Sequence, residues 1–251
     1  MTFSLSALNI RGILLDIEGT TTPIAFVHDV LFPFARARVR DYLANHSTSA
    51  EVLHDLARLR EEHARDVAQQ LDPPASGVLH ADYAELDAIV AYIHWLMDHD
   101  RKSTGLKSLQ GKIWEQGYRD GELKAEVFSD VPSALRRWHR TGLRVAIFSS
   151  GSVLAQKLLF AHTGAGDLKG FLDAYFDTTT GPKTESESFR RISSELKLDP
   201  RQLVFISDVT AELDAANDAG MHSLLCIRPG NLPQKAAHNR PTIWSFDEVK
   251  D

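Results

Sequence analysis

The sequence predicts an α/β protein in which a doubly wound parallel sheet carries an inserted helical domain. Two observations lead to this fold class. After residue 125, short apolar runs of strand length alternate with amphipathic segments of helical length, a pattern typical of a parallel sheet covered by helices on both faces. Between residues 28 and 122 the apolar residues follow helical spacing only. Because this block is too long for one crossover, we interpret it as a separate helical domain.

The first strand of the sheet is expected at residues 10–17. Its apolar run ILL is continuous and ends in Asp16, which suits a strand covered on both faces. The segment EGTTTPI that follows contains Gly19 and Pro23. It is expected to be a turn or loop, because both residue types interrupt helices.

The helical block shows two apolar stripes. In each, most of the spacings are three or four residues, which places side chains on one face of a helix. The first stripe consists of Tyr83, Leu86, Ile89, Ile93 and Leu96, and the second of Val52, Leu56, Leu59 and Val67. The segment LDPPASG between them is expected to be a loop, because a helix does not continue through its prolines. Residues 98–112 are expected to form a loop and the start of a helix.

The elements after residue 125 alternate between helix and strand. A helix is expected to begin at Val131-Pro132 and to end at Gly142. Strands are expected at 144–148, 174–176, 203–207 and 223–227, with helices at 152–162, from a capping box at 184–187 through Leu196, and at 211–219. Right-handed crossovers between parallel strands bring their carboxyl ends to one edge of the sheet, where ligands bind.

Composition and charge exclude several classes of protein. The 251 residues are 43% apolar and include 28 Lys and Arg against 34 Asp and Glu, a net charge of −6. This balance provides no general basic field for a nucleic acid, and no apolar run approaches the roughly 18 residues of a membrane span. The single cysteine, Cys226, is expected to be a small core residue. The first residues lack the pattern of a signal peptide, so we expect a cytoplasmic protein.

Polar residues follow the strands at the carboxyl edge of the predicted sheet. In chain order they are Asp16 and Glu18, Ser149 and Ser150, Lys183, and Asp208 with Glu212 one helical turn later. These side chains suit phosphoryl transfer. A carboxylate can attack phosphorus, Mg²⁺ relieves the repulsion between carboxylates and a phosphate, and lysine and serine groups bind the phosphate oxygens.

DIEGT after the first strand, the apolar strand that ends at Ser149, Lys183 and the SDxxxE segment resemble the four motifs of the haloacid dehalogenase superfamily. Together they span the predicted core in a specific order and spacing. The chain departs from the superfamily pattern at Glu18, where most of its phosphatases have Asp. The segments DIEGTTTPI, DRKSTGLKSLQGKIW and SDVTAELDAA are similar to the enolase-phosphatase family of methionine salvage. That resemblance covers essentially the whole chain.

The resemblance implies a haloacid-dehalogenase-like catalytic core at residues 1–27 and 123–251 and a helical cap domain at residues 28–122. It implies a monomeric enzyme with one Mg²⁺ per subunit and a small phosphorylated diketone as substrate. The enzyme would enolise 2,3-diketo-5-methylthiopentyl-1-phosphate and then remove the phosphate through an aspartyl-phosphate. The product would be the acireductone 1,2-dihydroxy-3-keto-5-methylthiopentene.

The resemblance also implies residue roles. Asp16 is the nucleophile and a metal ligand, and Asp208 is the last protein ligand of Mg²⁺. Glu18 contributes its main-chain carbonyl to the metal site, and its side chain is the candidate acid and base. Lys183 binds the phosphate and stabilises Asp16, and Ser149 and Ser150 bind the substrate.

Other interpretations of single residues remain open. Glu212 either orients a ligand of the metal site or lies on a helix surface, and one of the two serines either binds the substrate or only caps a helix. Trp95 and Trp114 are packing residues or, with Phe26, line an apolar slot for the methylthioalkyl tail. Arg101, Lys102 and Lys107 either close over the anionic substrate or form a solvated face.

Three other functions also compete with this interpretation. The first is a phosphatase of the same superfamily that acts on another small phosphate ester. The second is a phospho-Asp signalling module, and the third is a scaffold without enzymatic activity.

Overall fold

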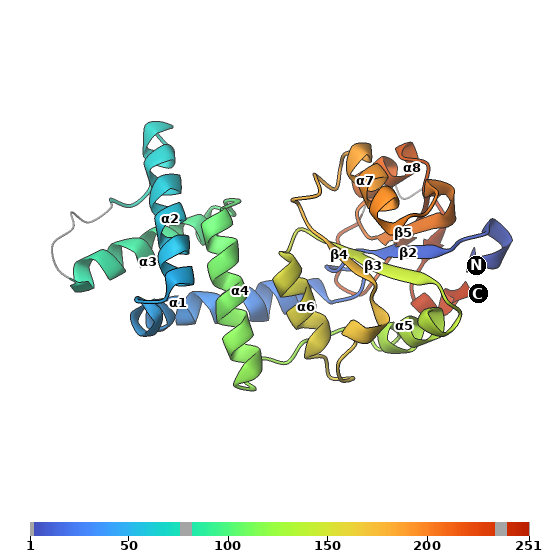
Figure 1. The fold of residues 1–251 in the computed structure, drawn as a ribbon, viewed down its shortest axis with the longest axis horizontal. Coiled ribbons are helices and arrows are strands. Elements are labelled where there is room, and N and C mark those ends of the chain that lie inside the picture. The colour runs from blue at the N-terminus through green and yellow to red at the C-terminus, as the bar shows by residue number, and fades with distance from the viewer. Residues whose placement is uncertain (1–2, 76–81, 234–239, 251) are drawn as a thin grey trace. The chain divides into compact units, whose positions relative to one another are not determined.

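The computed structural model describes residues 3–75, 82–233 and 240–250. Its chain divides into two compact units (Figure 1). The core unit comprises residues 1–29 and 124–251, and the helical unit comprises residues 30–123.

The core unit contains a six-stranded sheet in which all neighbouring strands are parallel. Its strand order is β4-β3-β2-β5-β6-β7. The strands are β2 (Gly12–Leu15), β3 (Arg144–Phe148), β4 (Ala174–Phe176), β5 (Leu203–Ser207), β6 (His222–Cys226) and β7 (Thr242–Ile243). The predicted parallel sheet is therefore confirmed. The edge strand β7 was not predicted, because two residues carry no periodicity.

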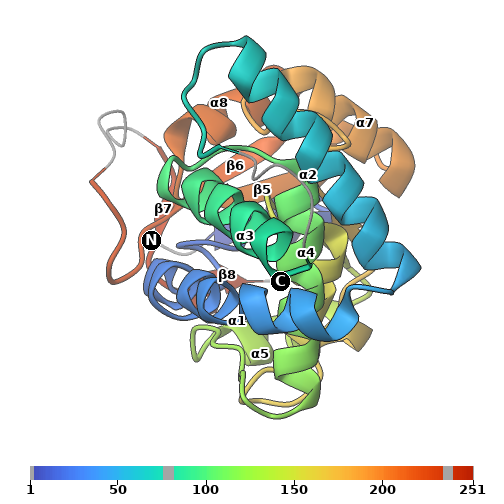
Figure 2. The ribbon, with the colours of Figure 1, turned by 90° about the vertical axis from the view of Figure 1, so that its left-hand side faces the viewer.

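Helices cover both faces of this sheet, which confirms the doubly wound fold class. Helices α5 (Val131–Arg140) and α6 (Val153–Ala161) lie on one face, and α7 (Ser186–Leu196) and α8 (Thr210–Asp218) lie on the other (Figures 1 and 2). Under α7, the ring of Phe189 packs on Phe148 and Phe205 with centroids 5.4 and 5.0 Å apart. The predicted core residue Cys226 is fully buried, and burial raises the pKa of its thiol to about 12.

Two details of the core unit differ from the sequence predictions. The capping box at 184–187 was wrong, because α7 begins at Ser186 and Glu185 precedes it without a side-chain capping bond. The amide of Glu185 instead donates to the carbonyl of Pro182 in a turn, at 3.2 Å. The first and last described strands, β1 (Phe3–Ser4) and β8 (Val249–Lys250), form a small parallel sheet of their own that was not predicted.

The helical unit consists of α1 (Phe32–His46), α2 (Ala50–Ala68), α3 (Asp82–Asp98) and α4 (Thr104–Arg119), and a π-helical segment, Phe26–Leu31, leads into α1. Helix α4 contacts both α1 and α2, and α3 packs on α1 (Figure 2). The loop and helix start predicted at 98–112 are confirmed, because Ser103 Oγ accepts a bond from Leu106 N–H at 2.9 Å and α4 begins at Thr104. The predicted loop LDPPASG lies inside the described residues only as far as residue 75.

The buried face of α2 is more polar than the predicted stripe. Val52 and Leu59 are buried as expected, but Val67 is 53% exposed. The same face instead buries Asp55, His63 and Asp66. Each has a partner: Asp55 pairs with Lys112, the His63 ring bonds the carbonyl of Pro74 at 2.7 Å, and Asp66 accepts from Tyr92 at 2.8 Å. Hydrogen bonding therefore overrides the apolar pattern here.

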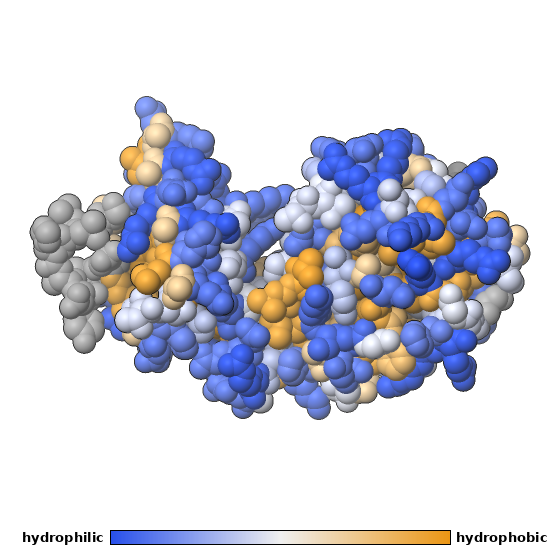
Figure 3. Space-filling view, viewed as in Figure 1, coloured by the Kyte–Doolittle hydropathy of each residue, from blue (hydrophilic) through white to orange (hydrophobic). Residues whose placement is uncertain are grey.

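The stripe predicted on α3 agrees better with the structure. Ile93 and Leu96 are buried, Leu86 and Ile89 are half-buried, and the side chain of Tyr83 lies outside the described part. Most of the surface drawn in Figure 3 is hydrophilic, and apolar residues gather over α6, whose sequence is VLAQKLLFA. Among the described helices, none has the length and apolar character needed to cross a bilayer.

Candidate active site

The carboxyl ends of β2 and β5 bring Asp16 and Asp208 to the same edge of the sheet. The strands pair in register, with Leu15 opposite Ile206. The amide of Asp16 continues this ladder and donates to Ile206 O at 3.0 Å. Asp208 stands two residues beyond Ile206, and both carboxylates are buried. Asp208 is not the N-cap of the next helix, because α8 begins at Thr210 after Val209.

Lys183 joins two of the carboxylates at this edge. Its Nζ lies 2.6 Å from Asp16 Oδ1 and 2.7 Å from Glu212 Oε2, and the hydroxyl of Ser207 also donates to Glu212 at 3.0 Å. Glu212 is therefore a residue of the site and not of the helix surface. Burial alone would lower the pKa of Lys183, but Asp16 and Glu212 raise it above the usual value, so the ammonium stays charged.

The loop that carries Lys183 is fixed by a close contact with α7. The hydroxyl of Ser188 donates to the carbonyl of Pro182 at 2.7 Å. Gly181 has a φ of 141°, and a Cβ at this position would overlap Ser188 Oγ. Only glycine satisfies both conditions, so Gly181 and Ser188 together define the position of Lys183.

Negative charge is in excess at the site. Asp16 and Glu212 contact the ammonium of Lys183, and Asp208 adds a third buried carboxylate. Burial, followed by the charges of Asp16 and Glu212, raises the pKa of Asp208 to about 7. Burial and then Asp16 raise the pKa of Glu212 to about 7, although Lys183 and Ser207 oppose the shift. The site therefore favours an additional cation.

The loop from Asp16 to Thr22 folds tightly around one carbonyl group. Ile17 O accepts bonds from the amides of Thr20, Thr21 and Thr22, at 3.2, 2.9 and 2.9 Å. Gly19 adopts a φ of 71°, and the half-buried Glu18 precedes it. The predicted loop is confirmed. Glu18 lies in this loop, two residues after Asp16.

Ser149 and Ser150 follow β3, the strand beside β2, but differ in exposure. Ser149 is buried and its Oγ accepts from the Gly151 amide at 3.2 Å, whereas Ser150 is exposed. Neither caps α6, because Ser152 Oγ accepts from Ala155 N–H at 3.3 Å. Gln156 fixes this loop by donating to the carbonyls of Gly151 and Phe176, both at 2.8 Å.

The aromatic residues predicted to line a slot have separate neighbours. Trp114 is buried and donates to Leu31 O at 2.8 Å, whereas the ring of Trp95 stacks on Tyr92 and contacts His99 at a tilted angle. Phe26 belongs to the core unit. A shared slot for the substrate tail stays a prediction.

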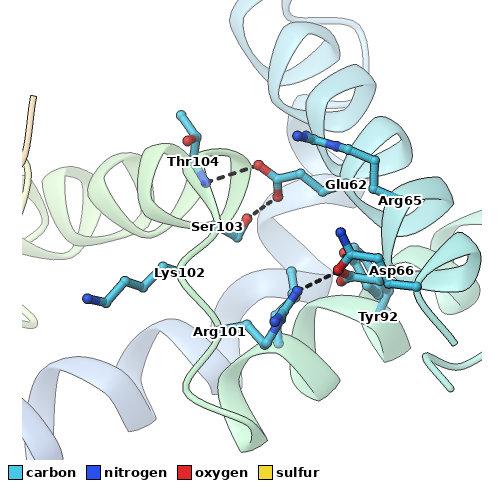
Figure 4. A pocket seen from close by; sticks show the side chains of 10 residues that line it. Glu62, Arg65, Asp66, Tyr92, Arg101, Lys102, Ser103 and Thr104 are labelled. Atoms are coloured by element: carbon cyan, nitrogen blue, oxygen red, sulfur yellow. Dashed lines mark hydrogen bonds and ion pairs between the residues drawn. The ribbon is translucent and has the colours of Figure 1, made fainter. Parts of the chain in front are cut away.

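A polar pocket of about 220 Å³ lies inside the helical unit (Figure 4). Arg101 is engaged there, since its Nη2 lies 2.6 Å from the buried Asp66. Glu62 accepts from the Ser103 hydroxyl and, at 3.0 Å, from Thr104 N–H. Arg101 therefore anchors the loop before α4, and Lys102 beside it lines the pocket. An anion-binding role for Lys102 or Lys107 stays a prediction.

An aspartate after the central strand, a buried lysine and an acidic pair after the neighbouring strand define a phosphoryl-transfer hydrolase on a doubly wound sheet. The family model for haloacid dehalogenase-like hydrolases matches residues 10–220. The chain belongs to this family and, within it, to the enolase-phosphatases, as its relatives show.

Enolase-phosphatase E1 of Synechococcus elongatus is 52% identical over 96% of this chain and 98% of its own length. A protein of Arabidopsis thaliana named probable bifunctional methylthioribulose-1-phosphate dehydratase/enolase-phosphatase E1 is 44% identical over 95% of this chain and 48% of its longer sequence. The crystal structure of the UTR4 protein of Saccharomyces cerevisiae superposes with a TM-score of 0.76 at 32% identity. This match covers 95% of this chain and 99% of that one.

The sequence alone did not decide whether Glu212 belongs to the site or to the surface of a helix. Glu212 follows Asp208 by four residues, a spacing that brings a side chain back over the preceding turn of a helix. This signal was visible in SDVTAE. The burial that decides between a site residue and a surface residue was not.

Proposed function

We propose that the protein is a bifunctional, Mg²⁺-dependent enolase-phosphatase. It enolises 2,3-diketo-5-methylthiopentyl-1-phosphate and dephosphorylates the enol to the acireductone of methionine salvage. The main support for the phosphatase activity is the buried contact between Lys183 and Asp16, which are 167 residues apart in the chain. The enolase step is supported by the enolase-phosphatase names of relatives that match along most of the chain, and the substrate is the one implied by the resemblance of the sequence to that family. These relatives are named as enzymes, which argues against the signalling module and the scaffold.

Dephosphorylation proceeds in two displacements at phosphorus. Asp16 is the nucleophile in the first and the leaving group in the second. A carboxylate oxygen of Asp16 bonds to phosphorus, the bond from phosphorus to the ester oxygen breaks, and the leaving oxygen takes a proton from Glu18. Water then attacks the aspartyl-phosphate and gives a proton back to Glu18. The bond from Asp16 to phosphorus breaks and inorganic phosphate leaves. Both residues return to their starting states.

Lys183 supports this chemistry through its charge. Its ammonium touches Asp16 and would bind the phosphate oxygens that lie against the same carboxylate. Glu212 holds the other side of the ammonium at 2.7 Å, so Lys183 has one direction left for substrate. Ser149 and Ser150, at the end of the neighbouring strand, are the proposed substrate-binding hydroxyls.

The residues at this edge fit a magnesium ion. Mg²⁺ is usually bound by one or two carboxylates with waters and substrate phosphate. Asp16 and Asp208 supply two carboxylates, and the main-chain carbonyl of Glu18 is the proposed third protein ligand. Across residues 3–75, 82–233 and 240–250, no three His, Cys, Asp or Glu side chains form a metal cluster. The bound ion would neutralise the excess negative charge and polarise a substrate carbonyl.

Enolisation needs a base beside the carbon that loses its proton and positive charge beside the carbonyl oxygen. Glu18 is the proposed acid and base in at least one step, since its side chain is one methylene longer than the Asp usual in the superfamily. Residues 28–122 are proposed to act as the cap domain and to supply the contacts to the methylthioalkyl tail. We keep the monomeric state and the cytoplasmic location as predictions.

The test is an assay of the diketone phosphate with purified protein, in which enediol absorbance and phosphate release are followed together. We expect both signals with Mg²⁺, neither with a chelator, and no phosphate release from Asp16→Asn. Phosphate release from unrelated esters only would leave the phosphatase chemistry and remove the enolase function.

A further inference from the structure

The segment after β6 forms a turn that points back at the loop after β2. In Arg228-Pro229-Gly230-Asn231, the amide of Asn231 donates to Arg228 O at 3.1 Å and Gly230 has a φ of 89°. Proline at the second position and a positive φ at the third are the features of a type II turn. The turn places the side chains of its two end residues beside the loop from Asp16 to Thr22.

Both end residues of the turn hold the main chain of this loop. Three successive carbonyls of the loop accept bonds from outside it: Gly19 O from Asn231 Nδ2 at 2.9 Å, Thr20 O from Arg228 Nε at 3.1 Å, and Thr21 O from Phe128 N–H at 3.0 Å. Arg228 also pairs with the buried Asp130 at 2.9 Å, between the rings of Phe128 and Phe246. It is therefore part of the packing of the core. The Asn231 side chain, a neutral amide, makes no ion pair, and it bonds to Gly19, the residue that follows Glu18.

The amide of Asn231 can be oriented in only one way. Its nitrogen faces two carbonyls, Gly19 O and, at 3.3 Å, Cys226 O, so the nitrogen must be the donor. Its Oδ1 is buried without a hydrogen-bond partner among the described residues. A Cβ on Gly19 would lie 2.5 Å from Asp208 Oδ2 and 2.9 Å from Asn231 Oδ1. Gly19 is thus enclosed between the proposed metal ligand Asp208 and Asn231, and its carbonyl direction depends on the Asn231 amide.

We propose that Asn231 is a positioning residue: it fixes the peptide between Gly19 and Thr20, one residue beyond Glu18, and so directs the Glu18 carboxyl at the leaving oxygen of the substrate. The inference rests on the proposed function, in which Glu18 donates that proton. When the bond from phosphorus to oxygen breaks, the electron pair stays on the leaving oxygen. A strongly basic oxygen needs the proton of Glu18 at that moment. A weakly basic oxygen, such as that of p-nitrophenolate, leaves without it.

The test compares two aryl esters of similar size, phenyl phosphate and p-nitrophenyl phosphate, on wild type, Asn231→Ala and Asn231→Asp. Asn231→Asp keeps the shape of the side chain and removes the donor. For both variants we expect kcat on phenyl phosphate to fall about 30-fold, because misplacing an acid of this kind forfeits much of its contribution. We expect a loss of about 3-fold or less on p-nitrophenyl phosphate, with KM changed by less than about 2-fold. Asn217→Ala, on the exposed side of α8, is the matched control and should match wild type on both esters.

The ratio of the two rates is measured on one preparation, so a variant that is only partly folded still gives a valid ratio. An equal loss on both esters would show that Asn231 supports the site only through general stability and would overturn the proposal. An unchanged rate on both esters would overturn it as well. Wild type that hydrolyses neither ester nor the diketone phosphate would instead refute the proposed function, so the two failures are distinguishable.

Discussion

Gly181→Ala is expected to damage the position of Lys183 and the stability of the core unit together. The φ of 141° at Gly181 is one that side-chain-bearing residues rarely adopt, and forcing it costs about 1–3 kcal/mol. The added Cβ would also overlap Ser188 Oγ, and overpacking of this kind costs a further 1–3 kcal/mol or so. We therefore expect a loss of about 3 kcal/mol in the free energy of unfolding. For a chain of this length, that is roughly a 10 °C fall in Tm.

The second variant, Ser188→Ala, separates the two contributions. Alone it loses the bond to Pro182 O and about 1 kcal/mol. Combined with Gly181→Ala it also removes the overlapping oxygen, so the double variant should lose at least about 1 kcal/mol less than the two single losses added together. Urea unfolding gives the free energies, and kcat should fall by about 10-fold or more in Gly181→Ala, because Lys183 moves with its loop. A Gly181→Ala protein within about 0.5 kcal/mol of wild type, or strictly additive losses, would refute this reasoning.

Three further predictions concern charge. Without metal, Asp208 keeps a proton in the folded protein up to its pKa of about 7, while the unfolded chain releases it near pH 4. Its contribution to stability therefore falls as pH rises from about 4 to 7. Urea unfolding in a chelator should show wild type losing about 2 kcal/mol between pH 5 and pH 8 relative to Asp208→Asn, and a parallel pH course in both proteins would contradict this. Lys183→Met should lower kcat by at least about 10³-fold and destabilise the protein by about 3 kcal/mol at pH 8, since Asp16 and Glu212 lose their buried partner; stability equal to wild type would count against the pairing. In the helical unit, Asp66→Ala should cost about 1–3 kcal/mol and speed hydrogen exchange in α2 and α3, and unchanged protection would show that its bonds to Tyr92 and Arg101 contribute little.

The sheet and its order of elements were predictable because buried parallel strands are short, continuous apolar runs. ILL, RVAIF, LVFIS and SLLCI each follow or precede a clear helix signal, and all four lie in the sheet as expected. The strands β1, β7 and β8 have two residues each, too few to show any period. Pairing with a neighbouring strand creates them, and for β1 and β8 that neighbour lies at the other end of the chain.

The interior of the helical unit was less predictable for a different reason. The apolar stripe of α2 pointed to Val67, yet the helix buries Asp66 one residue earlier because Tyr92 and Arg101 satisfy its carboxylate. Such a choice depends on partners in α3 and in the loop after it. Hydrophobic periodicity counts polar residues as exposed, so it cannot anticipate a buried polar pair.

The residues of the candidate site also fall into a predictable and an unpredictable group. Asp16, Lys183 and Asp208 were found because each follows a strand, and parallel topology brings strand ends together. Asn231 and Gly181 act through main-chain geometry. Their sequence signals, RPGN and GPK, predict turns but not which loop the turn supports. Positioning residues of this kind become visible only when the hydrogen bonds are known.

The most direct test of the central claim is a rapid-quench time course on the diketone phosphate. It follows enediol absorbance, phosphate bound to the peptide that contains Asp16, and free phosphate in one experiment. We predict that the enediol appears first, that the peptide-bound phosphate rises and falls, and that free phosphate follows, with the last two signals absent in Asp16→Asn. Free phosphate that appears at full rate in Asp16→Asn, or without any phosphate on that peptide in wild type, would contradict the account.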